Sequence, residues 1–499
     1  MGQRPNVLVL HTDQQRFDSL GSSGNPYAHT PNLDRLAEEG VCFTRHIAAN
    51  TVCMPSRASL FTGLYPPAHG VWSNGIPLNR RLYANINVEN VDEARVCPEP
   101  ATMADLFAAA GYDTVAFGKL HLTPNLAPPS YGYPESWAVW ESGALDDWHG
   151  PYYGFRHVEM TQGHGEQPCH LGHYARWLQR EHPDVYQHVM DNAAAAPRPV
   201  PRLRNLYASA LPSELHNTQW LAERFCAYLE TRSDAQPFFA FIGFPDPHHP
   251  FTPPYDVVRD FEDAPVPDPV DPQGEAVRGG PLASAGFDVS HFTPEERRTI
   301  SRYTYATVAL IDRAVGRILE GLEASGHAGD TIVVFTSDHG EFLGDHGRLY
   351  KAETAAESLL HVPFILRAPG VSLPRRVETP MSNVDVLPTL LHLAGLEVPE
   401  GLHGQDMLEV LEEGREHVAL AYCAGGDPSL INTTVVDARY RFTLYPRLGW
   451  AELYDHREDP GECHNLAAAQ PSRVAAMRRL AEQALLRHYR PIVGRVSAW

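Results

Sequence analysis

The sequence has no pair of cysteines spaced as in a zinc site or a redox motif. It contains seven cysteines, an odd number, and no two of them are separated by two residues. A disulfide framework and a structural zinc site are therefore both disfavoured. No run of 18 or more apolar residues occurs, so we expect no membrane span. The apolar run at 7–10 is too short for a signal peptide, and we expect a cytoplasmic protein.

Basic residues are also scarce. Against 61 Asp and Glu stand 40 Lys and Arg, and the formal net charge is −21. No basic stripe offsets this charge, so nucleic acid is not an expected partner. An anionic substrate would have to be held by a few local cations or by a metal. The 43% hydrophobic content is that of a globular protein, and 499 residues suggest a large domain with a smaller one.

Four apolar, strand-like segments end in polar residues that are able to bind a metal or a substrate. These segments are residues 7–10, 114–117, 238–244 and 331–336. Residues 33–39 and 300–324 have apolar side chains at helical spacing. In an open α/β sheet, the active site gathers beyond the carboxyl ends of the strands. We therefore expect an α/β fold with a site at this edge.

The first and last of these segments lead to Asp13 and to Asp338-His339. Carboxylate oxygens with one imidazole suit Ca²⁺, Mg²⁺ or Mn²⁺, and the imidazole favours Mn²⁺. Taken alone, each residue is better explained by a turn cap or a polar loop. Two such groups at equivalent strand ends favour a metal site.

Two further regions differ in composition from the rest. Residues 126–215 are rich in Pro, His, Tyr and Trp and have weak periodicity, so we expect a loop-rich insertion that shapes the substrate entrance. After residue 410 the chain has short strand-like segments and a helical segment, at residues 418–422, 433–436, 440–445 and 472–486. We expect a large domain at 1–410 and a smaller α+β subdomain with a short antiparallel sheet at 411–499.

Cys53 lies four residues before Arg57. A lone cysteine is most often a small buried hydrophobe. A cation near a helix start would instead favour a reactive thiolate. The residues alone favour an activated cysteine at position 53.

The sequence Cys-Met-Pro-Ser-Arg at 53–57, followed by Ala-Ser-Leu-Phe-Thr-Gly, resembles the type I sulfatase motif, in which the cysteine is converted to formylglycine. The resemblance continues in order along the chain, at residues 6–13, 30–34, 118–121, 247–250, 336–340, 362–363, 385–395 and 453–455. It implies an alkaline-phosphatase-like α/β fold with a central, mostly parallel sheet flanked by helices. It also implies hydrolysis of sulfate monoesters by a formylglycine nucleophile and one divalent metal ion.

Some residues depart from the arylsulfatase pattern. Gln14 and His339 stand where many sulfatases have Asp and Asn, and this set resembles the phosphonate monoester hydrolase branch of the superfamily. Asn74 and Lys351 fit that branch too, whereas the Gly-Lys-x-His pattern at 118–121 matches arylsulfatases. A phosphonate monoester or phosphodiester hydrolase, or an enzyme that accepts both classes, therefore remains an alternative.

The resemblance implies a role for each site residue. The metal ligands would be Asp13, Gln14, Cys53, Asp338 and His339. The residues that touch substrate or nucleophile would be Arg57, Asn74, Lys119, His121, His248 and Lys351.

Among the latter group, Arg57 would hold the nucleophile and the anionic group, and Lys119 and Lys351 would bind non-bridging oxygens. His121 would position the hydrated aldehyde or take its proton. The leaving oxygen would be protonated by His248, shared with Lys351, and His249 is its rival. Asn74 would donate a hydrogen bond to the substrate.

The implied partners are a small anionic ester and a maturation enzyme that generates formylglycine. The sequence leaves a homo-oligomer open. An alternative of a different class is a binding protein that keeps the pocket without the modification. The mass of the peptide containing Cys53, in protein from the native host, distinguishes this binding protein from a formylglycine enzyme.

Overall fold

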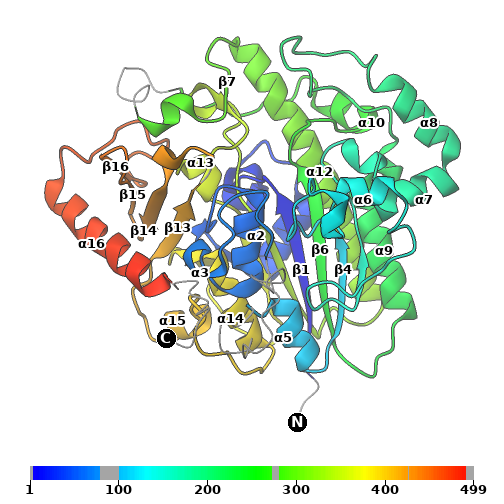
Figure 1. Cartoon of the computed structure of the whole chain (residues 1–499), viewed down its shortest axis with the longest axis horizontal. Helices are drawn as coiled ribbons and strands as arrows, with labels where there is room; N and C mark the ends of the chain where they lie inside the picture. The colour runs from blue at the N-terminus through cyan, green and yellow to red at the C-terminus, as the bar shows by residue number, and fades with distance from the viewer. Residues whose placement is uncertain (1–3, 79–99, 272–279, 425, 490–499) are drawn as a thin grey trace.

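The computed structural model of the chain describes residues 4–78, 100–271, 280–424 and 426–489 (Figure 1). One of the seven cysteines, Cys97, lies outside these residues. The central element is an eight-stranded sheet with the order β11-β2-β10-β8-β1-β6-β4-β5. Its strands are β1 (Asn6–Asp13), β2 (Val41–Phe43), β4 (Asp113–Gly118), β5 (His157–Glu159), β6 (Phe238–Pro247), β8 (Thr331–Ser337), β10 (Phe364–Arg367) and β11 (Arg376–Val377). β10 runs antiparallel to β8 and β2, and the other neighbours pair in parallel.

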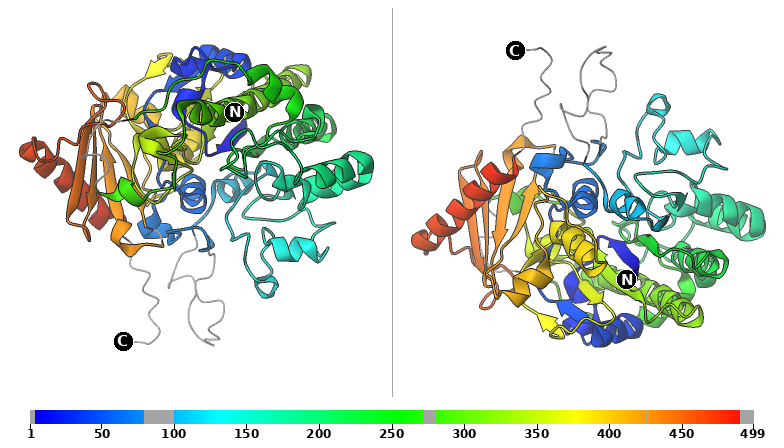
Figure 2. Two further views of the ribbon diagram at one scale, coloured as in Figure 1. Left: turned by 90° about the horizontal axis from the view of Figure 1, so that it is seen from above. Right: turned by 90° about the horizontal axis from the view of Figure 1, so that it is seen from below.

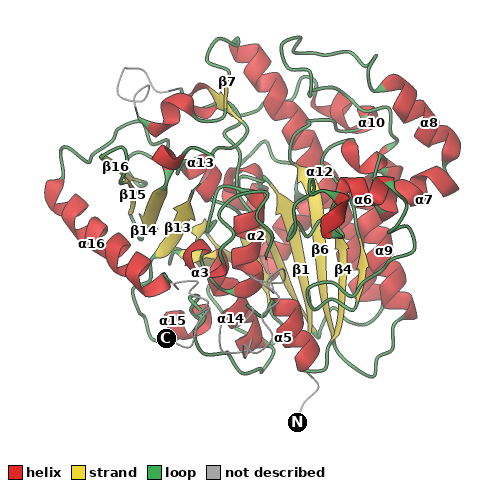
Figure 3. Ribbon diagram, viewed as in Figure 1, coloured by secondary structure: helices red, strands yellow, loops and turns green. Residues whose placement is uncertain are grey.

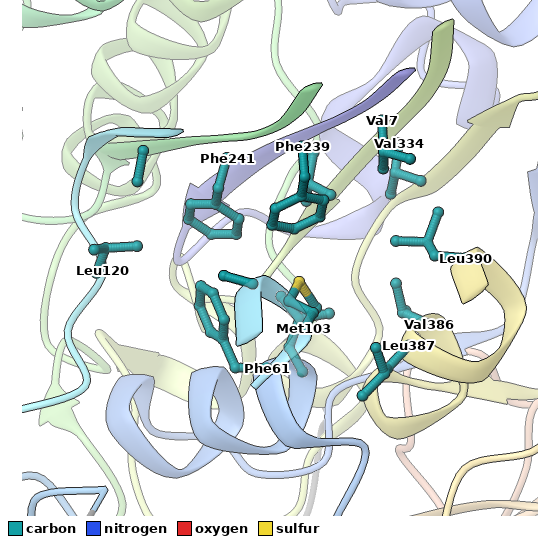
Figure 4. Close-up of a cluster of buried hydrophobic side chains, with 14 of the residues drawn as sticks. Val7, Phe61, Met103, Leu120, Phe239, Phe241, Val334, Val386, Leu387 and Leu390 are labelled. Atoms are coloured by element: carbon teal, nitrogen blue, oxygen red, sulfur yellow. The ribbon is translucent and has the colours of Figure 1, made fainter. Parts of the chain in front are cut away.

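Both faces of this sheet are buried, which explains why its strands read as continuous apolar runs. Alternate side chains point to opposite faces. Val7 and Val9 of β1 belong to one core cluster, and Leu8 and Leu10 belong to another. Figure 4 shows part of the first cluster, with strand residues such as Phe239 facing side chains of the covering helices.

Helices cover each face of the sheet. The first core cluster includes side chains from α2 (Cys53–Thr62), α5 (Met103–Ala109) and α14 (Asn383–Leu393). The second includes side chains from α1 (Pro31–Glu39), α9 (Asn217–Thr231) and α12 (Pro294–Ala324). The expected strands β1, β4, β6 and β8 and the expected helices α1 and α12 are all present, which confirms the predicted α/β class.

A separate four-stranded antiparallel sheet lies toward the C-terminus, at one end of the molecule (Figures 1 and 2). Its strands are β13 (Ala419–Cys423), β14 (Asn432–Val436), β15 (Tyr440–Tyr445) and β16 (Trp450–Asp455). α16 (Pro471–His488) packs on it through Met477 and Ala481. β16 was not expected as a strand, because Glu452 and Asp455 belong to residue types that are rare in strands. The domain boundary near residue 410 stays a prediction.

The segment 126–215 is more regular than expected. It contains α6 (Trp137–Glu141), α7 (His173–Glu181) and α8 (Pro183–Asn192), and these lie at the end opposite the C-terminal sheet (Figures 1 and 3). It also supplies β5, which pairs with β4 at the edge of the central sheet. A strand of three residues is too short for its periodicity to be visible in the sequence.

Shorter elements complete the described chain. The short helices are α3 (Pro66–His69), α10 (Tyr255–Val258), α13 (Glu357–Leu360) and α15 (Met407–Glu412). Two further small sheets pair β3 (His46–Ile47) with β12 (Met381–Ser382) and β7 (Phe287–Asp288) with β9 (Arg348–Leu349). Among the described helices, none combines the length and apolar character that a membrane crossing requires.

The C-terminal sheet contains a buried charge network around Arg441 of β15. The Arg441 side chain is fully buried. Its guanidinium donates two hydrogen bonds to the carboxylate of Glu462 and one, at 3.3 Å, to Glu452. Burial raises the pKa of Glu452 to about 7. Within the described part of the chain, Arg441 is the cation that pairs with both carboxylates, so this network depends on it.

We expect Arg441→Met to lower the free energy of unfolding by about 3–5 kcal/mol, because it leaves buried carboxylates without their cation. Denaturant unfolding followed by fluorescence measures the change. The matched control is Arg415→Met, whose side chain is 44% exposed and pairs with the exposed Glu413. The control should lose about 1 kcal/mol or less. Equal losses for the two variants would contradict the prediction.

Candidate active site

The site lies where the central strands of the sheet end. β1 ends at Asp13, and β8 ends at Ser337, just before Asp338. Thr12 pairs with Ser337 in the parallel register, so the two aspartates leave neighbouring strands at the same level. β4 leads to Lys119, and β6 leads to His248. This edge is the one at which the sequence predicts the site.

Cys53 is the first residue of α2 and is buried beside these strand ends. Asp13, Cys53, Asp338 and His339 are all buried, and their potential ligand atoms lie within 4.8 Å of one another. The structure thus brings together four of the five predicted metal ligands as one cluster.

The fifth predicted ligand, Gln14, lies beside the cluster. Its backbone N–H donates to Asp338 Oδ1 at 3.0 Å. Its side-chain amide nitrogen contacts His249 and Glu341. Its Oε1 atom is buried without a hydrogen-bond partner. A buried carbonyl oxygen without a partner, on a residue whose backbone adjoins the cluster, is an atom that a divalent cation would satisfy.

Arg57 anchors the two aspartates from one turn further along α2. Its Nη2 lies 3.0 Å from Asp13 Oδ2, and its Nε lies 2.8 Å from Asp338 Oδ2. Burial would raise the pKa of Asp13, but the charges of Lys119, His248 and Arg57 hold it well below its ordinary value. Both carboxylates are therefore oriented by a fixed guanidinium fork.

The thiol of Cys53 lies among positively charged groups. Lys351 Nζ is 2.8 Å from Cys53 Sγ, and His339 Nε2 is 3.3 Å from it. Burial and Asp13 oppose ionisation, yet Lys351 and Lys119 bring the pKa of the Cys53 thiol below its ordinary value. The position is therefore that of an activated cysteine rather than of an inert core cysteine.

The structure separates the two histidines that the sequence left as rivals. His248 Nε2 lies 2.8 Å from Lys351 Nζ, so His248 adjoins the cation that contacts Cys53. His249 instead contacts Gln14 and packs against Tyr350 with ring centroids 4.1 Å apart. The geometry therefore favours His248 over His249 on the leaving-group side.

The remaining predicted residues also lie around the cluster. Lys119 Nζ is 2.6 Å from Asp13 Oδ2. His121 adopts a left-handed φ of 56°, and its buried Nδ1 has no hydrogen-bond partner. Burial and then Lys119 lower the pKa of His121 well below its ordinary value. Asn74 Oδ1 accepts a hydrogen bond from the Met54 N–H at 3.0 Å, which places its amide at the start of α2.

The site contains one residue that the sequence analysis did not single out. His164, in the segment 126–215, contacts Lys119 Nζ through Nε2 and stacks on His248 with ring centroids 3.7 Å apart. No strand end or motif marks it. The sequence signal that remains is its place between Gly163 and Gly165, which permits a close approach of the backbone.

A family model described as sulfatase matches residues 5–396. The chain belongs to the sulfatase family. A second model, described as the C-terminal part of N-sulphoglucosamine sulphohydrolase, matches residues 344–488 of this sulfatase-family chain. These matches confirm the resemblance drawn from the 53–63 motif, and with it an enzyme of the sulfuric ester hydrolase class.

Known proteins similar to this sulfatase-family chain include both sulfatases and phosphonate hydrolases. An arylsulfatase of Clostridium perfringens is 28% identical over 93% of this chain and 90% of its own length. The multifunctional alkaline phosphatase superfamily protein PehA of Trinickia caryophylli is also 28% identical, over 97% of this chain and 95% of its own. The phosphonate monoester hydrolase of Agrobacterium radiobacter superimposes with a TM-score of 0.76 at 27% identity, covering 97% of this chain and 96% of its own.

Proposed function

We propose that this sulfatase-family chain hydrolyses sulfate monoesters, with Cys53 converted to formylglycine and one divalent metal ion held by Asp13, Gln14, Asp338 and His339. The observation that carries the proposal is the position of Cys53. It lies where the buried ligand cluster meets the cationic groups of Lys351, Lys119 and Arg57. This is a compact site for one small anionic group, and it agrees with a net charge of −21 on the whole chain.

The described residues fit a divalent metal ion and a formylglycine aldehyde. The donor set of carboxylates, an imidazole and the orphaned Gln14 Oε1 suits Mn²⁺, Ca²⁺ or Mg²⁺. The hydrated aldehyde would supply the attacking hydroxyl, and the metal would lower the pKa of that hydroxyl and neutralise charge on the substrate. The resemblance of residues 53–57 to the modified motif supports the aldehyde, and a maturation enzyme would be needed to form it.

On the substrate side, the chain's own residues bind the anion and move protons. Arg57 holds Asp13 and Asp338 in place through its two ion pairs. Lys119 holds the non-bridging oxygens. His248, whose Nε2 lies 2.8 Å from Lys351 Nζ, would protonate or stabilise the leaving oxygen, a role that it would share with Lys351.

His121 and Asn74 complete the binding side. Burial and Lys119 keep His121 neutral, because they lower its pKa. A neutral imidazole with an unpartnered Nδ1 can take a proton from the nucleophile during product release. The Asn74 amide would donate a hydrogen bond to substrate from beside the start of α2.

A phosphonate monoester or phosphodiester hydrolase is the second candidate. It is supported by the full-length similarity to the Agrobacterium radiobacter enzyme and by the Gln14, Asn74, His339 and Lys351 pattern. The same machinery would serve all of these substrates, since each presents one tetrahedral anionic centre and one leaving oxygen.

The test compares turnover of an aryl sulfate, a phosphate diester and a phosphonate monoester by one preparation in which conversion of Cys53 has been checked by mass spectrometry. We expect the highest kcat/KM for the aryl sulfate. A clear preference for the diester or the phosphonate would overturn the sulfatase proposal in favour of the second candidate. An unmodified thiol in protein from the native host would overturn the formylglycine mechanism.

A further inference from the structure

His164 lies in a segment that is built to hold it in place. Glu166, two residues later, accepts hydrogen bonds from Tyr207 Oη, at 2.6 Å, and from Ser209 Oγ. The His164 N–H donates to Gln167 Oε1 at 3.1 Å. These bonds hold His164 and the residues that follow it in place.

Gly165 fits this segment tightly against the chain that follows β6. It has a φ of 55°, and a Cβ atom there would lie 2.3 Å from Pro250 O and 2.6 Å from Thr252 Oγ1. A larger residue would clash with that backbone and displace His164. The close approach therefore sets the position of His164 relative to His248, only two residues before Pro250.

The imidazole of His164 bridges two residues of the proposed machinery. Its Nε2 contacts Lys119 Nζ, and its ring lies parallel to that of His248, with an interplanar angle of 16°. Potential ligand atoms of Asp13, His164 and His248 lie within 4.8 Å of one another. Burial, and then the charge of Lys119, hold the pKa of His164 well below its ordinary value. The ring is therefore neutral at pH 7.

The hydrogen-bonding capacity of Lys119 determines which nitrogen of His164 carries the ring proton. An ammonium has three N–H donors and no acceptor, so Nε2 of His164 must be the acceptor and its ring proton sits on Nδ1. Within the described residues, the other partner of Lys119 Nζ is Asp13 Oδ2. Among the described residues, the ammonium is thus held on the protein side by one imidazole contact and one ion pair.

We infer that His164 is a positioning residue: it holds the Lys119 ammonium so that an N–H that His164 does not engage is directed at a non-bridging oxygen of the substrate anion. This inference rests on the proposed function. The inference adds to the site a residue from the segment 126–215. This segment would then position a substrate-binding lysine, in addition to the expected role in shaping the substrate entrance.

Three replacements separate the hydrogen bond from the ring stacking. His164→Gln keeps an acceptor and loses the ring, His164→Phe keeps a ring and loses the acceptor, and His164→Ala loses both. We expect kcat/KM for the best substrate to fall roughly 10- to 100-fold in the Ala and Phe variants. The Gln variant should retain most of the activity. His170→Ala, at an exposed position in the same segment, is the matched control and should match the wild type.

A double-mutant cycle with Lys119→Ala tests whether His164 acts through the lysine. We expect Lys119→Ala/His164→Ala to be no slower than Lys119→Ala alone, because the ammonium to be positioned is already gone. Melting temperature, metal content and formylglycine content are measured for every variant. Additive losses, an active Phe variant with an inactive Gln variant, or wild-type activity of the Ala variant would each overturn the inference.

Sulfate binding measured by calorimetry distinguishes failure of the His164 inference from failure of the proposed function. If the wild type hydrolyses an ester but His164→Ala binds sulfate and turns over like the wild type, the inference alone fails. If the wild type neither binds sulfate nor hydrolyses any of the three substrates, the proposed function fails and the inference fails with it.

Discussion

Replacing Cys53 with alanine is expected to lower the turnover of a sulfate monoester by about 10⁴-fold or more, because the substitution removes the nucleophile itself. Cys53 is 1% exposed at the start of α2, and alanine there removes only the terminal group of one small side chain from a site held by other residues. The fold and the ligand cluster should therefore survive. Steady-state kinetics with a chromogenic aryl sulfate measures the loss, and circular dichroism verifies the fold.

The matched control is Cys226→Ala. Cys226 lies on α9, is partly exposed, and contacts the Arg317 carbonyl, away from the site. This variant should retain wild-type kcat and KM. Activity of Cys53→Ala within tenfold of the wild type would refute a nucleophile at this position. Loss of activity in both variants would indicate damage to the fold.

Asp338→Asn is expected to weaken metal binding by more than about 100-fold, since the loss of even an outer hydrogen-bond partner of a metal ligand costs 10- to 100-fold. Asp338 also receives the Arg57 Nε–H at 2.8 Å and the Gln14 N–H at 3.0 Å, so its charge organises two neighbours as well. Activity should fall in parallel with metal content, and a chelator should inactivate the wild type until Mn²⁺ or Ca²⁺ is restored.

The matched control here is Asp330→Asn, at a part-exposed position directly before β8. It should keep both metal and activity. Elemental analysis of the purified variants, with isothermal titration of Mn²⁺ into chelator-treated protein, gives the comparison. Full activity in wild-type protein shown to be free of metal would contradict a role for the ion.

The strands and the site edge could be predicted from the sequence because their signals are local. Each long central strand is a run of apolar residues, and a strand buried on both faces needs only that pattern. The elements that the sequence did not reveal are those that depend on context. β5 has three residues and is held by its pairing with β4, and Glu452 is accommodated in β16 because Arg441 compensates its charge.

The predicted site residues divide in the same way, into those that local signals reveal and those that depend on packing. Asp13, Cys53, Arg57, Asp338 and His339 follow from motifs and strand ends, and the structure places all five together. The choice between His248 and His249 could not be made from their adjacent positions. The structure favours His248 because the chain after β6 carries its ring toward Lys351 and carries the His249 ring toward Gln14 and Tyr350.

By itself, the sequence determined which family this chain belongs to, which strands form the centre of the sheet, and that few cations are available to hold an anion. The tertiary structure decided where those cations lie and what fixes them. Lys351 contacts Cys53 across 298 residues of chain, and His164 contacts Lys119 across 45. Such contacts are set by sheet register and by the packing of the segment 126–215. Local sequence patterns specify elements, whereas distances between remote side chains depend on how those elements pack.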